Sequence, residues 1–393
     1  MSKLQSPQRL LIAGGGLAGT LIATAFAARR PDVAITLAES GDRLGGNHTW
    51  SAFGTDFGPR ERALIDPFVS HRWDGYDCRF TGGAFTYSTP YLSIASDDLD
   101  RVARHRLGDA VRLDTPVTAL DAAGAVLADG SRIEADAVID ARGPRQLAGV
   151  TLRWQKFLGR EVRLADPHGL TQPTIMDAAV PQLDGYRFVY LLPFGPDRLL
   201  IEDTYYAEDP AVDAAVLTER IDAYAAARGW TIRAEERVEV GALPLLLAGD
   251  LPTLWREATA EGAVPVGLRA GLFHPVTGYS LPLAARTATR LAELAGPVTT
   301  ARLMAAVEGI ARDHFARSAF DRMLNRLLFL AGPPERRHLV LQRFHGLPQP
   351  LIERFYAGAL KRSDQARILA GKPPVPLLAA LGALPERAAL RSG

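Results

Sequence analysis

Two adjacent carboxyls, Glu202 and Asp203, follow the apolar run Leu199-Leu200-Ile201. This pattern predicts a strand that ends in an acidic pair. Neighbouring side chains of a strand point to opposite faces of its sheet, so only one of the two carboxyls can face a given substrate. A carboxyl shielded from water stays protonated near neutral pH and can serve as a general acid. The alternative is a solvated strand end that is followed by a turn.

A glycine-rich turn, Gly14-Gly15-Gly16-Leu17-Ala18-Gly19, lies near the N-terminus. It follows an apolar strand expected over 10–13 and opens a helix expected over 20–29, and a second strand over 33–38 ends at Glu39. In such a unit the glycines allow a tight turn and close approach of a pyrophosphate, and the acid accepts ribose hydroxyls. The pattern therefore predicts a dinucleotide site, against the alternative of a glycine-rich surface turn. Glu39 disfavours a 2′-phosphate, since two anions repel.

Two later segments, 137–143 and 266–278, resemble flavoprotein segments that return to the nucleotide and approach the flavin, which makes FAD the expected cofactor. Arg269 departs from that pattern, because many such proteins carry an acid there. The predicted cofactor contacts are Gly14, Gly16, Leu17, Ala18, Gly19, Glu39, Val117, Asp140, Arg142, Gly143, Gly271, His274, Pro275, Thr277 and Gly278.

The composition describes a packed protein of 393 residues, 47% hydrophobic and 23% charged, which excludes a disordered chain. A net charge of +1 argues against a protein that grips nucleic acid along its surface. The single cysteine, Cys78, excludes an internal disulfide, and no His-x-x-x-His pair suggests a metal site. No apolar run of about 18 residues predicts a transmembrane helix, and the N-terminus lacks a signal-peptide pattern, so we expect a cytoplasmic protein.

The elements that must position these residues follow from periodicity and turn signals. Short strands at 111–113, 117–120, 125–127, 132–134 and 137–139 predict a meander followed by a buried strand. Further strands are expected at 186–192 and 198–203, and helices at 211–228 and 280–294.

The last 93 residues are mostly helical in period and carry 15 Lys and Arg against 7 Asp and Glu. Within them, apolar side chains at helical spacing are flanked by arginines. The apolar residues are Phe320, Met323, Leu324, Leu327, Leu328 and Leu330, and the arginines are Arg317, Arg322, Arg326, Arg336 and Arg337. This pattern fits a basic amphipathic helix that binds a membrane surface, or core packing with a solvated arginine face.

Several motifs together resemble those of the bacterial lycopene β-cyclases. They are GGNHTW at 45–50, YRFVYLLP at 186–193, LLIEDT at 199–204, LFHPVTGYS at 272–280, RMLNRLLFLAGP at 322–333, RFYAG at 354–358 and LAGKPPVP at 369–376. The similarity spans nearly the whole chain in order, and the combined set is highly specific.

The resemblance implies an α/β fold of the p-hydroxybenzoate hydroxylase type. We expect a Rossmann-type FAD-binding domain from 1–50, 95–150 and 260–300. Residues 51–94 and 151–259 are expected to form a β-rich, antiparallel substrate domain. Residues 301–393 are expected to form a helical, basic region that faces a membrane.

The resemblance also implies the reaction. Family members close the ψ-ends of lycopene into β-ionone rings, through γ-carotene to β-carotene, without net redox change but with reduced FAD, for which NAD(P)H is the expected reductant. It makes Glu202 the general acid, with Asp203 as a residue that orients it or binds backbone. The alternatives are an FAD-dependent monooxygenase or reductase of an isoprenoid, and a non-catalytic flavin-binding regulator or carotenoid carrier.

A substrate of this kind is soluble only in lipid, so we expect peripheral association with the inner face of the cell membrane; oligomeric state and ring number stay open. Trp50, Tyr186, Tyr190 and Phe273 are expected either to line a substrate channel or to pack in the core. His274 is expected to contact the flavin, to remove the final proton or to be structural, and His48 to lie in a loop near the flavin.

Overall fold

The computed structural model describes residues 7–143, 147–183, 185–371 and 375–390. A parallel sheet of five strands has the order β18-β12-β1-β2-β8. Its strands are β1 (Gln8–Ala13), β2 (Val33–Ala38), β8 (Val111–Arg112), β12 (Ala137–Asp140) and β18 (Val264–Pro265). The expected β-α-β unit is confirmed, because β1 and β2 pair in parallel and α1 (Leu17–Arg29) connects them. The helix begins at Leu17 rather than Thr20, because the glycine turn already ends at Gly16.

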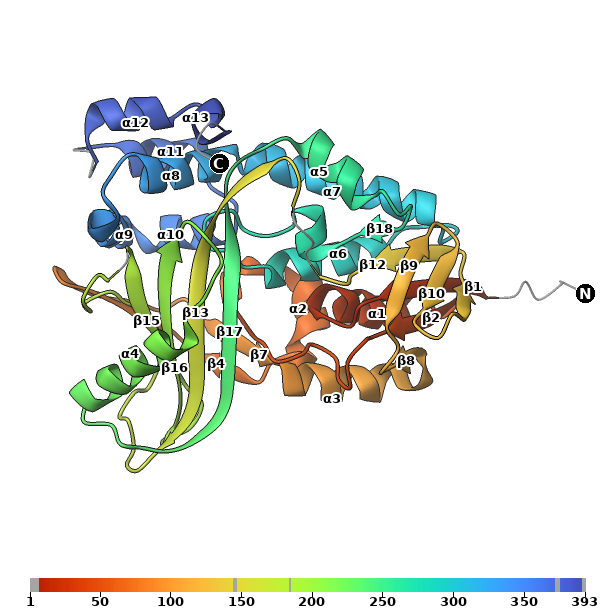
Figure 1. Ribbon diagram of the computed structural model, residues 1–393, viewed down its shortest axis with the longest axis horizontal. Coiled ribbons are helices and arrows are strands. Elements are labelled where there is room, and N and C mark those ends of the chain that lie inside the picture. Colours follow the sequence, from red (N-terminus) through yellow and green to blue (C-terminus); the bar gives the residue numbers. More distant parts are fainter. Residues whose placement is uncertain (1–6, 144–146, 184, 372–374, 391–393) are drawn as a thin grey trace, which may run out of the picture.

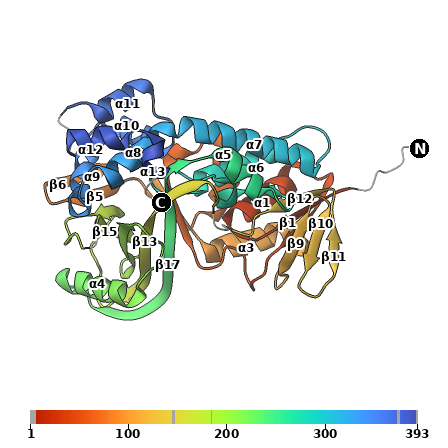
Figure 2. The same ribbon diagram turned by 45° about the horizontal axis from the view of Figure 1, so that its top comes forward.

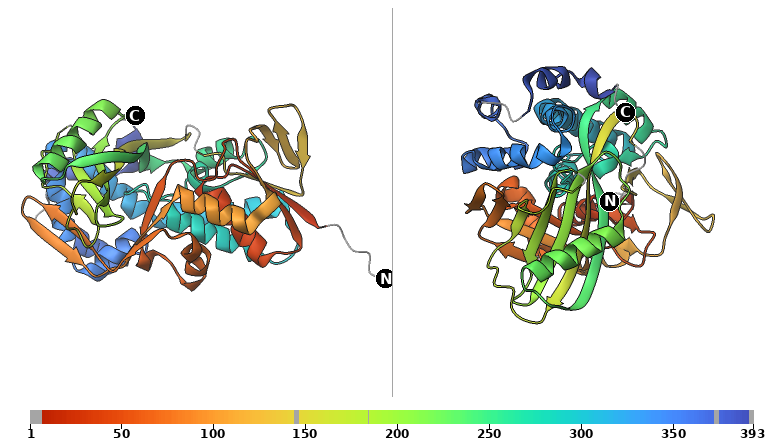
Figure 3. Two further views of the ribbon diagram at one scale, coloured as in Figure 1. Left: turned by 90° about the horizontal axis from the view of Figure 1, so that it is seen from below. Right: turned by 60° about the vertical axis from the view of Figure 1, so that its left-hand side comes forward.

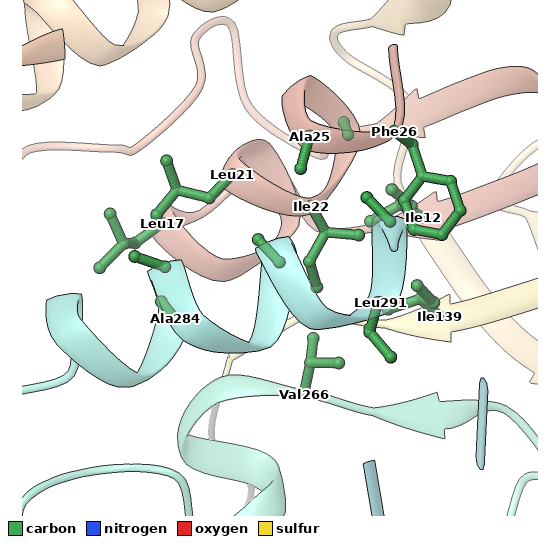
Figure 4. Packing of buried hydrophobic residues seen from close by; sticks show 14 of the residues in the cluster. Ile12, Leu17, Leu21, Ile22, Ala25, Phe26, Ile139, Val266, Ala284 and Leu291 are labelled. Atoms are coloured by element: carbon green, nitrogen blue, oxygen red, sulfur yellow. The ribbon is translucent and has the colours of Figure 1, made fainter. Parts of the chain in front are cut away.

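The core beside this sheet fixes the glycine turn in place. Helix α1 packs on α6 (Leu281–Ala292), and Leu17, Ile22 and Phe26 of α1 lie among Ala284 and Leu291 of α6 and side chains of the strands (Figure 4). Helices α3 (Ser96–Leu107) and α7 (Thr300–Arg317) complete the layer around them (Figure 1). Most residues of α1 from its start to Phe26 are buried, which holds its N-terminus in a fixed position beside the glycine turn.

The expected meander is only partly right. A separate sheet, in the order β11-β10-β9, contains β9 (Val117–Asp121), β10 (Gly124–Leu127) and β11 (Arg132–Glu134). The segment at 111–113, in contrast, does not belong to the meander: Val111 pairs with Leu37, which makes β8 the outer strand of the parallel sheet. A strand of two residues carries no alternation from which its partner could be predicted.

A sheet of seven strands faces the nucleotide-binding part of the chain, in the order β17-β13-β16-β15-β14-β5-β6. Its strands are β5 (Tyr76–Phe80), β6 (Gly83–Tyr87), β13 (Val150–Leu164), β14 (Thr174–Asp177), β15 (Arg187–Pro193), β16 (Arg198–Ala207) and β17 (Ile232–Gly249). Helix α4 (Ala214–Ala227) lies across one face of this sheet (Figure 3). The expectation that a strand ends at Asp203 is wrong, because β16 continues to Ala207, so both carboxyls lie in mid-strand.

The remaining strands and short helices connect these two layers. A third small sheet has the order β3-β7-β4. Its strands are β3 (Thr49–Phe53), β4 (His71–Trp73) and β7 (Tyr91–Ala95), and nearby lie α2 (Pro59–Ile65) and α5 (Leu251–Ala258). Single 3₁₀ turns occur at η1 (Gly54–Asp56), η2 (Asp66–Phe68), η3 (Gly108–Ala110), η4 (Gly267–Ala270) and η5 (Pro334–Arg336).

The last third of the chain is helical, as its periodicity predicted. It contains α7, α8 (Ala319–Leu330), α9 (Arg337–His345), α10 (Gln349–Tyr356), α11 (Arg362–Leu369), α12 (Leu377–Ala383) and α13 (Glu386–Leu390). Helices α8 to α13 gather at the end of the molecule away from the N-terminus (Figure 2). Lys372, Pro373 and Pro374 of the expected 369–376 motif lie outside the described residues.

The expected solvated or membrane-facing arginine face is only partly right, because Arg317 and Arg336 are exposed but the arginines of α8 point inward. Arg322 and Arg326 are buried, and Arg326 donates hydrogen bonds to the carbonyls of Leu247, Ala383 and Leu384. Arg337 donates to carbonyls at the end of α8 in the same way. A guanidinium carries five N–H donors, so one arginine can donate hydrogen bonds to several backbone carbonyls that lack another partner. The helical periodicity of the sequence does not reveal this role of a buried arginine.

Candidate functional site

A cavity of about 360 Å³ lies between the glycine turn and the seven-stranded sheet. Its walls include Gly16, Leu17 and Ala18 on one side. On the other side stands one face of the sheet, with Gln155, Phe157, Tyr190, Leu192, Leu200, Glu202, Glu239, Gly241 and Leu243. The opposite face of the same sheet packs on α4. The cavity thus joins the expected dinucleotide site and the expected general acid.

The glycine turn has the form that a pyrophosphate requires. Gly14 has φ +104°, and a Cβ there would lie 2.4 Å from the carbonyl oxygen of Ala141. A Cβ at position 19 would lie 2.0 Å from the carbonyl oxygen of Gly14. At Gly16, in contrast, a Cβ would meet no atom within 4 Å, and α1 starts there with neither an acidic residue nor a side-chain cap. Open space before uncapped backbone N–H groups suits an anion.

Glu39 lies at the end of β2, beside the turn. Its carboxylate accepts hydrogen bonds from the N–H of Gly15, at 2.6 Å, and of Gly41, at 2.8 Å. This fixed position at the strand end is the one from which an acid accepts ribose hydroxyls in dinucleotide-binding folds. The turn and the acid therefore fit the expected FAD.

The Gly16→Val variant should fold with a thermal midpoint close to that of the parent but bind flavin at least about 100-fold more weakly. A Cβ at this position meets no atom within 4 Å, and the methyl groups of a valine would fill the approach to the helix N-terminus. Retained flavin absorbance after gel filtration is the measurement. Gly19→Ala is the control for a folding defect, because its methyl group would overlap the backbone of Gly14 and should lower the thermal midpoint. Normal flavin content in Gly16→Val would contradict this use of the turn.

A buried ionic network supports the strand that returns to the site. Asp140 is paired with Arg142 at 2.8 Å and with Arg269 at 3.2 Å, and Arg142 also reaches Glu261 at 2.8 Å. Arg142 donates a long hydrogen bond of 3.5 Å to the carbonyl of Val117. The arginine that replaces the usual acid at position 269 thus finds its partner in Asp140. Among the predicted cofactor contacts Val117, Asp140, Arg142 and Gly143, it is Gly143 that lines the main cavity.

The residues expected at 271–278 divide among three places. Gly278 lines the main cavity, and Gly271 lines a small apolar cavity beside α5. His274 and Pro275 line a neighbouring cavity of about 190 Å³, which shares Tyr279 with the main one. Thr277 accepts a hydrogen bond from the N–H of Tyr279.

His274 is held by backbone on both ring nitrogens. Nε2 lies 3.0 Å from the carbonyl oxygen of Phe355, and Nδ1 accepts from the N–H of Val276 at 3.3 Å. Burial lowers the pKa of His274 to about 4, so the ring is neutral near pH 7. Both nitrogens are occupied, which favours the structural alternative for this histidine over a base.

Glu202 lies on the cavity wall with its carboxyl desolvated. Thr204 donates a hydrogen bond to its Oε1 at 2.8 Å. Burial raises the pKa of Glu202 to about 8, and the negative charge of Glu239 adds to the rise. The side chain is therefore protonated near neutral pH and can donate a proton into the cavity.

Asp203 lies on the other face of the sheet, toward α4. It is fully buried and accepts hydrogen bonds from Nε of Arg187 at 2.9 and 3.1 Å. Burial raises the pKa of Asp203, an effect that Arg187 opposes. The structure thus separates the two carboxyls as strand geometry predicted, and it shows no Asp203 bond to Glu202.

Tyr190 and Tyr279 line the cavity with Glu202, and the sequence analysis singled out only Tyr190 of these two. The hydroxyl of Tyr190 bonds to that of Tyr91 and, at 3.0 Å, to that of Tyr279. Trp50 and Tyr190 line the cavity as expected of channel residues, whereas Tyr186 packs in the core. Phe273 lies at the small apolar cavity. Tyr279 follows the glycine turn at 278, a position that could have suggested its role.

Glu239 is a cavity residue that the sequence analysis missed. Its carboxylate contacts Nδ1 of His48 at 2.9 Å and the N–H of Thr49 at 3.0 Å. His48 also lines the cavity, next to Trp50. The alternation of charged and small residues around Glu239 in β17 was the available signal, but it is indistinguishable from that of a solvated edge strand.

Two further properties complete the description. Among the described residues, no three His, Cys, Asp or Glu side chains gather in a way that could hold a metal ion. Within the same part of the chain, no helix has both the length and the apolar character needed to cross a bilayer.

The chain is similar to known proteins over its whole length. The profile of the family described as "Lycopene cyclase protein" matches residues 9–381. A lycopene beta-cyclase from a Paracoccus species is 46% identical over 383 residues, covering 97% of this chain and 98% of that protein. A lycopene beta-cyclase from Pseudescherichia vulneris is 45% identical over 382 residues, covering 96% and 98%.

Solved structures show the same fold at low identity. A flavin-dependent halogenase from Xanthomonas campestris aligns with a TM-score of 0.58 at 14% identity, over 99% of this chain and 98% of that one. A 2-methyl-3-hydroxypyridine-5-carboxylic acid oxygenase aligns with a TM-score of 0.57 at 18% identity, over 80% and 89%. The expected α/β fold class is thereby confirmed.

Proposed function

The chain belongs to the lycopene cyclase family, and from that membership we propose that it closes the ψ-ends of lycopene into β-ionone rings, through γ-carotene to β-carotene. The observation that carries this proposal is Glu202, a protonated carboxyl on the wall of a largely apolar cavity that also borders the glycine turn. An alkene is a weak base, so its protonation needs an acid of this kind, held away from water.

The residues that line the cavity have separate roles in the proposed reaction. Glu202 donates its proton to the terminal double bond, and Tyr190, Tyr279 and Trp50 offer aromatic faces to the tertiary cation that results. Substrate bound against the largely apolar wall would keep water away from this cation, which water would otherwise capture. Ring closure then forms one carbon–carbon bond, and loss of a proton completes an isomerisation without net redox change.

FAD is the cofactor that the site fits. Gly14, Gly16 and Gly19 would hold its pyrophosphate and Glu39 its ribose. Bound in the reduced, anionic form, the flavin would supply negative charge that stabilises the cation. We propose NAD(P)H as the reductant.

An anaerobic assay tests this function. Protein with dithionite-reduced FAD should convert lycopene to β-carotene, and NAD(P)H should be consumed only to reduce the flavin. In a parallel reaction under labelled oxygen gas, an oxygen-labelled product would instead favour the monooxygenase alternative, and a saturated product in either reaction would favour the reductase alternative. Unchanged lycopene with fully reduced flavin would contradict the proposal.

We further propose that the protein docks on a membrane surface through a leucine patch on α12, from which the lipophilic substrate is taken. The leucine patch consists of Leu377, Leu378, Leu381 and Leu384, which share one helix face and are all exposed, Leu378 to 86%. Exposed basic residues lie on the flanking helices, namely Arg362 and Arg367 of α11 and Arg387 of α13. Apolar side chains with surrounding positive charge suit a bilayer that contains anionic lipids.

Replacing two of these leucines, in Leu378→Ser with Leu381→Ser, should weaken binding to vesicles of phosphatidylglycerol and phosphatidylcholine by about tenfold or more, since each inserted leucine contributes over 1 kcal/mol. Co-sedimentation with vesicles measures the effect. Val216→Ser is the matched control, because Val216 is exposed on α4 at a distance from the leucine patch in sequence. Equal binding of the double variant and the parent would exclude this docking surface.

A further inference from the structure

Glu202 and Glu239 belong to one row of the seven-stranded sheet. Gly159 of β13 pairs with Glu202 of β16 on one side and with Glu239 of β17 on the other. Residues directly opposite one another in antiparallel strands point to the same face, so both carboxyls point to the cavity, which they line. Two interstrand spacings, about 10 Å in all, separate their Cα positions.

A glycine stands between the two acids in this row, and neighbouring side chains already lie close to it. A Cβ at position 159 would lie 3.4 Å from Oε2 of Glu202 and 3.2 Å from Cδ1 of Leu200. Any larger side chain would press on Glu202, so the glycine keeps the place between the two acids free of a third side chain.

The surroundings of the two carboxyls differ. Glu202 receives one neutral hydrogen bond, from Thr204, and no cationic side chain among the described residues forms an ion pair with it. Glu239, which is 7% exposed, contacts His48 and the N–H of Thr49, and Nη1 of Arg237 lies 3.9 Å from its Oε2. Glu239 is thus tied to a histidine and to backbone, whereas Glu202 is free to face the substrate.

We propose that His48, positioned by Glu239, removes the proton that ends ring formation. With Nδ1–H donated to Glu239, the free nitrogen Nε2 is the acceptor, and the carboxylate stabilises the imidazolium that forms. His48 lines the cavity while 54% of its side chain is exposed, so the proton can pass on to water. This inference rests on the proposed cyclase function and adds a base to it.

The proton balance of one turnover is then complete. Glu202 gives a proton to the terminal alkene carbon, and a bond forms between the cationic carbon and the neighbouring double bond. The C–H bond next to the new cation breaks, its electrons form the ring double bond, and its proton goes to Nε2 of His48. Exchange with solvent returns one proton to Glu202 and removes one from His48, so no oxidant or reductant is consumed.

The type of ring formed tests this assignment separately from overall activity. A cation that lacks its base loses a proton from another adjacent carbon, which gives a ring double bond in a different position. The His48→Ala and Glu239→Gln variants should therefore cyclise at least about tenfold more slowly and yield ε- or γ-type rings beside β-type rings. Added imidazole should restore rate and β-type rings to His48→Ala.

Glu235→Gln is the matched control, since Glu235 lies on the same strand but pairs with Arg160 at the surface. Flavin spectra and thermal midpoints establish that the variants fold. If the parent cyclises but both variants act within about threefold of it and give only β-type rings, the base is elsewhere. Loss of rate with unchanged ring type and no rescue by imidazole would also overturn the proposal. Failure of the parent to cyclise would instead refute the proposed function.

Discussion

The Glu202→Gln variant should lose about 100- to 10,000-fold in the rate of ring closure while it keeps its fold and its flavin. Glutamine matches the size of the acid and can still accept the hydrogen bond from Thr204, but it has no proton to give to an alkene. Pigment formation per unit of flavin-loaded protein is the measurement. A variant that retains more than a tenth of the parental rate would show that the proton comes from another group.

The pH profile of the parent tests the same acid. Burial and the charge of Glu239 raise the pKa of Glu202 to about 8, and the active form is the protonated one. The rate with subsaturating substrate should therefore fall about tenfold per unit as pH rises above about 8. The charged groups around this carboxyl, Glu239 on β17 and Asp203 behind it, both act in the same direction. A profile that rises through pH 8 would contradict the assignment.

The Arg187→Met variant should lose up to about 3 kcal/mol in the free energy of unfolding, because it removes the cation that is hydrogen-bonded to the buried Asp203 and leaves only the positive charge of Arg220 near that carboxyl. Asp203 is fully buried and Arg187 is 4% exposed, so neither group can turn to water. Urea unfolding of the flavin-free and flavin-loaded protein measures the loss.

Variants that affect the adjacent carboxyls of Glu202 and Asp203 should thus have opposite effects on the rate of ring closure and on the free energy of unfolding. Glu202→Gln affects the rate and leaves stability near pH 7 unchanged or raised, since it removes a carboxyl that is costly to ionise in the fold. The double variant Arg187→Met with Asp203→Asn should recover part of the stability, because no unpaired charge remains. If Arg187→Met unfolds at the same urea concentration as the parent, the ion pair of Arg187 and Asp203 contributes little to the free energy of unfolding.

The local features of the site could be predicted from the sequence because they depend on neighbours in the chain. The glycine turn is set by steric limits at Gly14 and Gly19, which are visible in residue types. The separation of Glu202 from Asp203 follows from strand geometry alone. The assignments of site residues and of domain boundaries remain predictions that the variants above address.

Features that depend on pairing between distant strands could not be predicted. Glu239 faces the same cavity as Glu202 only because β16 and β17 both pair with β13 in a fixed register. Nothing in the sequence near Glu239 specifies that register. The inward arginines of α8 were missed for a related reason. Arg326 binds carbonyls of residues 247, 383 and 384, and helical period does not reveal which distant carbonyls need donors.

The size of the main cavity has a consequence for the order of events on the pigment. About 360 Å³ lies at the lower end of the range for ligand sites, and a flavin bound at the glycine turn would take part of it, so it cannot enclose a forty-carbon polyene. The rest of the polyene must remain outside the cavity during the reaction, so its other end cannot reach Glu202 while the first end is bound. A two-ringed product then requires the half-finished molecule to leave, turn end for end and enter again, and the monocyclic pigment should accumulate early in the time course.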